Sequence, residues 1–115
     1  MPVTIYHNPQ CSTSRKTLEL IREAGIEPVI VDYRRAGWTQ SLLKSLFKAM
    51  NLRPRDLLRV NGTPAEDLGL TDPAVSDDRL LAVMVAHPIL VQRPIVVSEK
   101  ATILARPPES VRDIL

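Results

Sequence analysis

The chain has 115 residues, of which 44% are hydrophobic and 24% are charged, and its formal net charge at pH 7 is +2. These values are ordinary for a folded protein, so we expect a single domain over residues 1–115 that buries its own core. The small net charge, the lack of any run of basic residues and an aromatic content of 3% argue against a nucleic-acid-binding surface.

The first half of the chain predicts alternating strands and helices. Residues 3–6 alternate in polarity and predict a short strand that ends in a turn. Residues 12–24 predict a helix with one apolar face, and Gly25 is a natural stop. Residues 27–33 form a continuous apolar run, as expected of a strand covered on both faces in a parallel sheet. A further helix follows, with Thr39 as its cap.

The second half predicts an insertion and then the rest of the sheet. Residues 51–78 are rich in turn residues and predict short helices and loops. A helix is expected next, and it must stop before Pro88. Residues 93–98 and 101–107 predict an antiparallel hairpin, and residues 108–115 predict a short closing helix. This order predicts an α/β fold of the thioredoxin or glutaredoxin type, with a four-stranded mixed sheet, flanking helices and a helical insertion.

Cys11 lies between the first predicted strand and the first predicted helix. A helix N-terminus lowers the pKa of a thiol and so increases the fraction of reactive thiolate. The neighbouring residues are turn-forming or polar, which favours an exposed nucleophile over a small buried hydrophobic residue. Ser14 stands where a second cysteine of a C-x-x-C pair would be, so a local dithiol mechanism is excluded. Thr17 stands where a cysteine-based phosphatase loop would need arginine.

The expected location and cofactor content follow from what the sequence lacks. No apolar run approaches the roughly 18 residues that a membrane span requires, and the first residues do not have the pattern of a secretory signal. We therefore expect a cytoplasmic monomer without membrane contact. The single cysteine cannot form an internal disulfide or, by itself, a structural zinc site. We expect no metal and no tightly bound cofactor, so thiol chemistry must use an external partner.

Several separated segments together resemble the glutaredoxin-linked arsenate reductases of the ArsC family. They are "YHNPQCSTSRKTLEL", "DLLR", "SDDRLLAVMVAHPILVQRPIVV" and "LARP", and they span nearly the whole chain in the family's order. The resemblance implies a thioredoxin-like fold with a helical insertion, which agrees with the element order predicted above.

The resemblance also implies a set of site residues. Cys11 matches the catalytic cysteine of the family, and its three oxyanion-binding arginines match Arg59, Arg93 and Arg106. Arsenate is a tetrahedral anion, and guanidinium groups offer planar pairs of donors that remain charged at ordinary pH. We therefore expect these arginines to be both catalytic and substrate-binding.

The implied reaction begins with attack of the Cys11 thiolate on arsenate, which leaves an arseno-cysteine adduct. The arginines offset the charge on the oxygens. Reduced glutathione, acting as co-substrate, then attacks the arsenic centre, arsenite leaves, and glutaredoxin resolves the resulting mixed disulfide. The presence of a single cysteine is consistent with this external supply of electrons.

Four further residues have secondary roles in this scheme. His7 matches a family histidine, which favours the thiolate if it is protonated and nearby, or else is a turn residue bonded to backbone. Ser14 either donates a hydrogen bond to the thiolate or caps the helix. His87 is expected at a helix end in a structural role, and Pro94 matches the cis-proline of thioredoxin-like folds.

Two other functions remain open from the sequence. One is a glutathione-dependent thiol oxidoreductase of the ArsC type that does not act on arsenate. The other is a non-catalytic stress regulator that binds RNA polymerase, because such regulators occur in the same superfamily. Those regulators commonly carry C-x-x-C, which this chain lacks, and the three arginines favour oxyanion chemistry.

Overall fold

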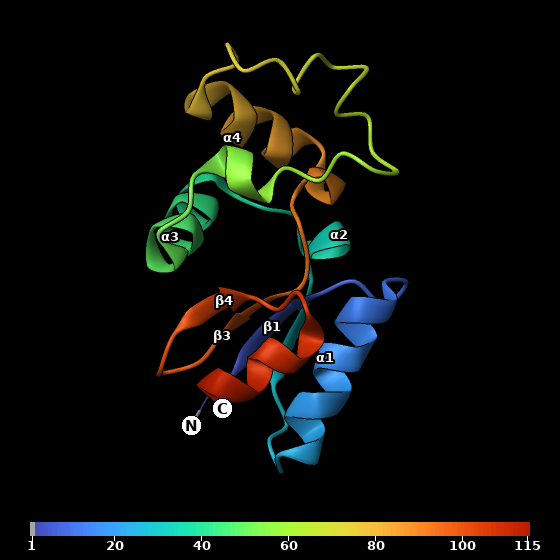
Figure 1. Cartoon of the computed structure of the whole chain (residues 1–115), viewed down its shortest axis with the longest axis vertical. Coiled ribbons are helices and arrows are strands. Elements are labelled where there is room, and N and C mark those ends of the chain that lie inside the picture. The colour runs from blue at the N-terminus through green and yellow to red at the C-terminus, as the bar shows by residue number, and fades with distance from the viewer. Residues whose placement is uncertain (1) are drawn as a thin grey trace. The chain divides into compact units, whose positions relative to one another are not determined.

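A four-stranded sheet with the strand order β2-β1-β3-β4 organises the computed structural model, which describes residues 2–115 (Figure 1). The strands are β1 (Thr4–His7), β2 (Val29–Asp32), β3 (Ile95–Val97) and β4 (Thr102–Leu104). β1 pairs with β2 in parallel and with β3 antiparallel, and β3 pairs with β4 antiparallel. The predicted mixed sheet and C-terminal hairpin are therefore confirmed, and the fold is thioredoxin-like.

The prediction for β2 was wrong in one respect. Its apolar run suggested a strand covered on both faces, but β2 is an edge strand, and Val29 and Ile30 are 58% and 41% exposed. Continuous β-branched residues stabilise extended backbone whether or not they are covered, so their pattern alone does not distinguish a central strand from an edge. The observed strand also ends one residue before the predicted end at residue 33, because Tyr33 begins the one-turn helix α2 (Tyr33–Ala36).

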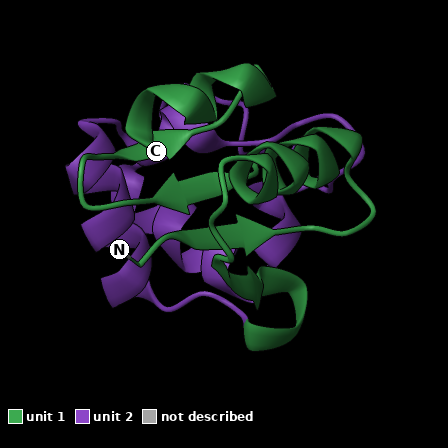
Figure 2. Ribbon diagram, turned by 90° about the horizontal axis from the view of Figure 1, so that it is seen from below, with its two compact units in different colours: residues 1–36, 93–115 green, residues 37–92 purple. Residues whose placement is uncertain are grey.

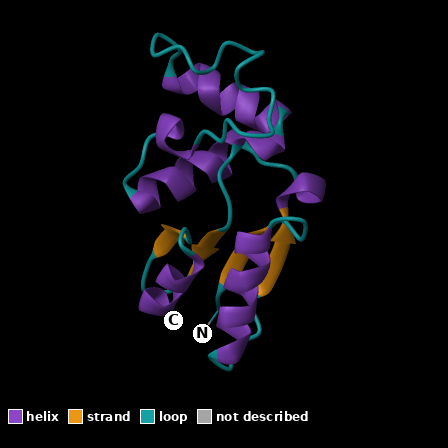
Figure 3. Cartoon of the chain, turned by 45° about the vertical axis from the view of Figure 1, so that its right-hand side comes forward, coloured by secondary structure: helices purple, strands orange, loops and turns teal. Residues whose placement is uncertain are grey.

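The chain divides into two compact units, shown in Figure 2: unit 1 comprises residues 1–36 and 93–115, and unit 2 comprises residues 37–92. The single domain predicted from the sequence stays a prediction. Unit 1 holds the sheet, α2, helix α1 (Ser12–Glu23) and the closing 3₁₀ helix η3 (Pro108–Ile114). Figure 3 shows α1 and η3 as neighbouring helices beside the strands.

One apolar cluster holds unit 1 together. Helix α1 contributes Leu20 and Ile21, and η3 contributes Val111, all of which are buried. They pack with Ile5 of β1 and Val96 of β3, both of which are fully buried. Because β1 and α1 are both anchored in this core, the short turn that joins them has fixed ends.

Unit 2 is helical. It contains α3 (Gln40–Met50), η1 (Pro54–Leu57), α4 (Asp77–Ala86) and η2 (Pro88–Leu90). The expected cap is confirmed, because the Thr39 side chain accepts a hydrogen bond from the Leu42 N–H at 3.1 Å. His87 is the C-cap residue of α4, in agreement with its predicted structural place. Leu58 and Val91 form an isolated antiparallel bridge that the sequence did not suggest.

Residues 2–115 contain neither a membrane-spanning helix nor a candidate metal-binding cluster. No helix in this range is both long and apolar enough to cross a membrane. The same residues contain no group of three or more His, Cys, Asp or Glu side chains placed to hold a metal ion.

Candidate active site

Cys11 lies at the end of a tight turn that connects β1 to α1. The Cys11 backbone N–H donates to the Asn8 carbonyl at 3.0 Å, which closes the turn. Cys11 is the N-cap residue of α1, with an extended backbone at φ −95° and ψ 121°, and it is partly exposed. The thiol is therefore accessible at a helix N-terminus, where unpaired backbone N–H groups favour negative charge.

The surroundings of Cys11 lower the pKa of its thiol below the ordinary value. Partial burial raises the pKa, but the backbone N–H of Ser14, the side chain of Arg93 and the backbone N–H of Thr13 lower it by more in total. The Cys11 side chain does not make a capping hydrogen bond to α1. These donors nevertheless stabilise the thiolate, which is the nucleophilic form of the group.

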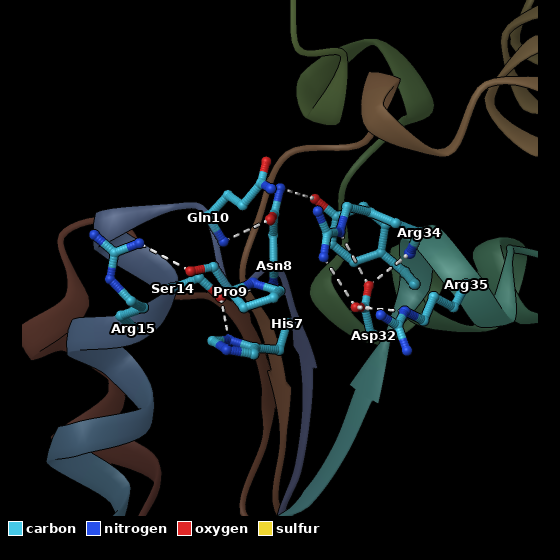
Figure 4. Close-up of polar contacts among 10 residues, drawn as sticks. His7, Asn8, Pro9, Gln10, Ser14, Arg15, Asp32, Arg34 and Arg35 are labelled. Carbon is cyan, nitrogen blue, oxygen red and sulfur yellow. Dashed lines mark hydrogen bonds and ion pairs between the residues drawn. The ribbon is translucent and has the colours of Figure 1, made fainter.

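Ser14 is fully buried and contacts the strand that precedes the turn. Its Oγ accepts a hydrogen bond from the Asn8 N–H at 3.0 Å and lies 2.6 Å from His7 Nδ1 (Figure 4). Ser14 is the third residue of α1, and Cys11 holds the N-cap position, so Ser14 does not cap the helix as one alternative had suggested. Instead, it links α1 to the end of β1.

His7 is buried, and its pKa is lowered below 6.5. Burial is the main cause; Asp32 opposes the shift, and Arg22, Arg15 and Arg34 add to it. The lowered pKa favours the neutral imidazole, and the role of His7 in supporting the thiolate stays a prediction. Its contact with Ser14 gives it a hydrogen-bonding place in the site.

Arg93 reaches the site from a position two residues before β3. It precedes Pro94 through a cis peptide bond, so the expected cis-proline is confirmed. Its Nε is buried and has no hydrogen-bond partner among residues 2–115, while its side chain acts on the Cys11 thiol. Arg106, which follows β4, is exposed, and its Nη1 donates to the Arg93 carbonyl at 2.9 Å. Unit 1 thus brings Cys11, His7, Ser14, Arg93 and Arg106 into one connected region.

Arg59 belongs to unit 2. Its backbone N–H donates to the Leu90 carbonyl at 2.7 Å, and its Nε donates to the Asn61 carbonyl at 3.2 Å. The Thr63 hydroxyl donates to the Arg59 carbonyl at 2.7 Å. The loop around Arg59 is therefore well ordered by hydrogen bonds, and its participation with Cys11 stays a prediction.

Asn8 is a site residue that the sequence argument missed. It is 6% exposed, and both its backbone and its side chain form hydrogen bonds within the turn and to Tyr33. Asparagine before proline is a known turn signal, because its side chain can bond to backbone two residues further on. The segment "HNPQC" contains that signal. The signal predicts a turn, but it does not predict that the asparagine holds the turn that carries the Cys11 thiol.

The ion pairs of Asp32 were also missed. The carboxylate accepts hydrogen bonds from Arg34 Nε at 3.2 Å and Nη2 at 3.1 Å, and it lies 3.9 Å from Arg35 Nε (Figure 4). Hydrogen bonding from Arg34 lowers the pKa of Asp32, although burial opposes this effect. Asp32 is aligned with His7 in the β1–β2 register, so this cluster lies at the same end of the sheet as the thiol turn.

Comparisons with known proteins agree with one another. The model of the ArsC family matches residues 6–114. An arsenate reductase of Rhizobium meliloti (strain 1021) is 50% identical over 115 residues, which are 100% of this chain and 82% of that protein. An arsenate reductase of Escherichia coli (strain K12) is 50% identical over 113 residues, which are 98% of this chain and 80% of that protein.

The structural similarity is equally broad. The solved structure of an arsenate reductase from Vibrio cholerae superposes with a TM-score of 0.95 at 41% identity, and the match covers 100% of this chain and 98% of the other.

Proposed function

Because the chain belongs to the ArsC family, we propose that it is an arsenate reductase, which reduces arsenate to arsenite with the Cys11 thiolate as nucleophile. The observation that carries the proposed role of Cys11 is its environment. It is a partly exposed thiol at a helix N-terminus, with a pKa lowered by two backbone N–H groups and by Arg93. Such a site favours both a thiolate and an incoming oxyanion.

The first step forms a bond between Cys11 Sγ and arsenic. One arsenate oxygen takes up protons and leaves as water, so the adduct is a thiol ester of As(V). Negative charge remains on the other arsenate oxygens. Arg93 has a buried Nε without a partner among residues 2–115, which supports a role as a donor to these oxygens.

Arg106 and Arg59 complete the proposed set of oxyanion-binding side chains. Arg106 donates one hydrogen bond to the Arg93 carbonyl, and its remaining guanidinium donors are available for the substrate. Arg59 donates its Nε to the Asn61 carbonyl within its own loop, and its guanidinium supplies a permanent positive charge that would act on arsenate. His7 and Ser14 contribute through the hydrogen bond between them, because burial lowers the pKa of His7 and favours its neutral form.

The second step reduces the arsenic. A glutathione sulfur attacks the arsenic centre and bonds to it. The two arsenic–sulfur bonds then break as a disulfide forms between Cys11 and glutathione, and the electron pair left on arsenic converts As(V) to As(III), which leaves as arsenite. The chain has no second cysteine that could displace the glutathione, so glutaredoxin removes it and restores the thiol. These steps suit a monomer in the cytoplasm, where glutathione is kept reduced.

A reconstituted assay tests the proposal. Purified protein is supplied with arsenate and with glutathione and glutaredoxin, together and with each omitted in turn, and arsenite is measured. Multiple turnovers are expected only when both are present. A plain glutathione disulfide is tested in parallel, because faster reduction of that substrate than of arsenate would favour the general thiol oxidoreductase. Absence of both activities would contradict enzymatic function and leave the binding-protein alternative.

A further inference from the structure

Asn8 uses every polar group it has in the turn that carries Cys11. Its backbone N–H donates to Ser14 Oγ at 3.0 Å, and its carbonyl accepts the Cys11 N–H at 3.0 Å. Its side-chain Oδ1 accepts the Gln10 N–H at 3.0 Å, and its Nδ2 donates to the Tyr33 hydroxyl at 3.4 Å (Figure 4). A buried residue with all four groups engaged fixes its surroundings strongly.

The four bonds join three elements of unit 1. Through Ser14, Asn8 is tied to the first turn of α1, and through Tyr33, which is fully buried, it is tied to α2. The Gln10 bond is a local side-chain turn that shapes the two residues before the thiol. The Cys11 bond then sets the direction in which the chain enters the helix. Asparagine suits this place because its side chain contains both an acceptor and a donor.

The placement of Cys11 at the N-cap of α1 depends on the backbone conformation of the 8–11 turn. An N-cap side chain can meet the N–H groups two and three residues later only if its backbone is extended, as it is at Cys11. Those N–H groups belong to Thr13 and Ser14, and both act on the thiol.

We propose that Asn8 is a positioning residue for the reaction: its side chain holds the 8–11 turn so that Cys11 keeps the N-cap position and its sulfur stays at the N-terminus of α1. This inference rests on the proposed function only in taking Cys11 as the nucleophile. Asn8 does not itself touch the sulfur in any hydrogen bond that the structure contains among residues 2–115.

Alkylation of Cys11 by iodoacetamide, measured against pH, tests this inference without arsenate. Asn8→Ala is expected to move the midpoint of the profile upward by about half a unit or more, which is about a threefold loss of thiolate well below the midpoint. The rate at high pH, where the thiol is fully ionised, should stay near the wild-type value. Asn8→Ala leaves the charged and titratable groups around the turn unchanged; they are His7, Arg15, Asp32, Tyr33, Arg34, Arg93 and Arg106.

Milder variants separate positioning from folding. Asn8→Ser keeps an acceptor for the Gln10 N–H but cannot reach Tyr33, and Tyr33→Phe removes only the hydroxyl. Both are expected to shift the profile upward by less than Asn8→Ala. Thr39→Ala is the control, because it removes the α3 cap in unit 2 and lowers the melting temperature without altering the turn. Its alkylation profile should match the wild type.

The outcomes distinguish the proposed role of Asn8 from the proposed arsenate reductase activity. Wild-type profiles in Asn8→Ala, or in both milder variants if Asn8→Ala does not fold, would overturn the role of Asn8 even if arsenate is reduced. An upward shift in the Asn8 and Tyr33 variants, absent in Thr39→Ala, would support it even if the wild type proved inactive toward arsenate.

Discussion

The two units of the molecule present their candidate arginines in different ways. In unit 1, Arg93 has a buried Nε without a partner among residues 2–115, and its side chain acts on the Cys11 thiol. In unit 2, Arg59 uses its Nε to bond the Asn61 carbonyl within its own loop. The Nε of Arg93 thus has no bond within the described residues, whereas the Nε of Arg59 is bonded within its own loop.

This difference indicates that the two units have different roles, one in forming the thiolate and the other in binding the substrate. The groups that lower the Cys11 pKa, which are two backbone N–H groups of α1 and Arg93, all belong to unit 1. Unit 1 therefore contains what is needed to form the thiolate. Arg59 is expected to act on the substrate alone. Variants of the two units should accordingly separate effects on the thiol from effects on arsenate.

The largest effect is expected from removing the nucleophile. Cys11→Ser should abolish arsenate reduction in the reconstituted assay, because a serine hydroxyl is scarcely ionised at neutral pH and cannot form the disulfide with glutathione whose formation supplies two electrons to arsenic. Circular dichroism should show an intact fold, since the residue is partly exposed. Residual turnover above the protein-free background would show that Cys11 is not the nucleophile.

Replacement of Arg93 should impair both the thiol and the substrate. Arg93→Ala is expected to lower kcat/KM for arsenate by roughly 30-fold to 900-fold, the equivalent of about 2–4 kcal/mol for a lost oxyanion donor. It should also raise the Cys11 pKa, measured by alkylation, because Arg93 lowers that pKa. Arg93→Lys, which keeps charge without paired donors, should lie between wild type and alanine. A loss of less than tenfold in Arg93→Ala would contradict the proposed role.

Arg59→Ala provides the sharpest contrast with Arg93. We expect a similar loss in kcat/KM, about 2–4 kcal/mol, but no change in the pH profile of Cys11 alkylation. Measuring both quantities on one preparation tests the division between the units. An upward shift of the Cys11 profile, comparable to that of Arg93→Ala, would show that the division is wrong.

Arg106 should have a smaller effect than either. Arg106→Gln removes the charge but keeps a side chain able to donate to the Arg93 carbonyl, whereas Arg106→Ala removes both. The alanine variant is expected to lose about 1–2 kcal/mol, roughly fivefold to 30-fold in kcat/KM. If glutamine restores activity fully, Arg106 orients Arg93 and does not bind arsenate through its charge.

The smallest expected effect is on stability. The pKa of Cys11 is lower in the folded chain than in the unfolded chain, where it is near 8.5. The thiolate therefore contributes stability that is complete above about pH 8.5 and is lost as the pH falls through the folded-state pKa. The free energy of unfolding of the wild type, minus that of Cys11→Ser, should thus rise with pH across this window. A flat or falling difference in urea titrations would argue against a stabilised thiolate.

Local sequence signals predicted most of the fold because they are short in range. The Thr39 cap, the Gly25 stop after α1 and the turn between β3 and β4 each depend on a few neighbouring residues. The exposure of β2 was not predictable in this way, because it depends on which strands lie beside it. The Leu58–Val91 bridge was missed for the same reason, since it joins residues far apart in the sequence.

The sequence predicted those site residues whose side-chain type alone indicates their chemistry. A lone cysteine at a strand–helix junction indicates a thiolate, and family motifs supplied the arginines. The protonation of His7 depends on its burial and on charges from other elements, which one segment of sequence does not contain. The hydrogen bonds of Asn8 and Ser14 depend likewise on how β1, α1 and α2 meet.

The most direct test of the account is the state of Cys11 after reaction with arsenate and glutathione in the absence of glutaredoxin. A reduced thiol and glutathione cannot form a disulfide unless an oxidant accepts two electrons, and arsenate is the only oxidant supplied. Under anaerobic conditions, mass spectrometry should find glutathione on Cys11 together with one arsenite released per chain. Unmodified Cys11 alongside released arsenite, or equal modification without arsenate, would contradict the account.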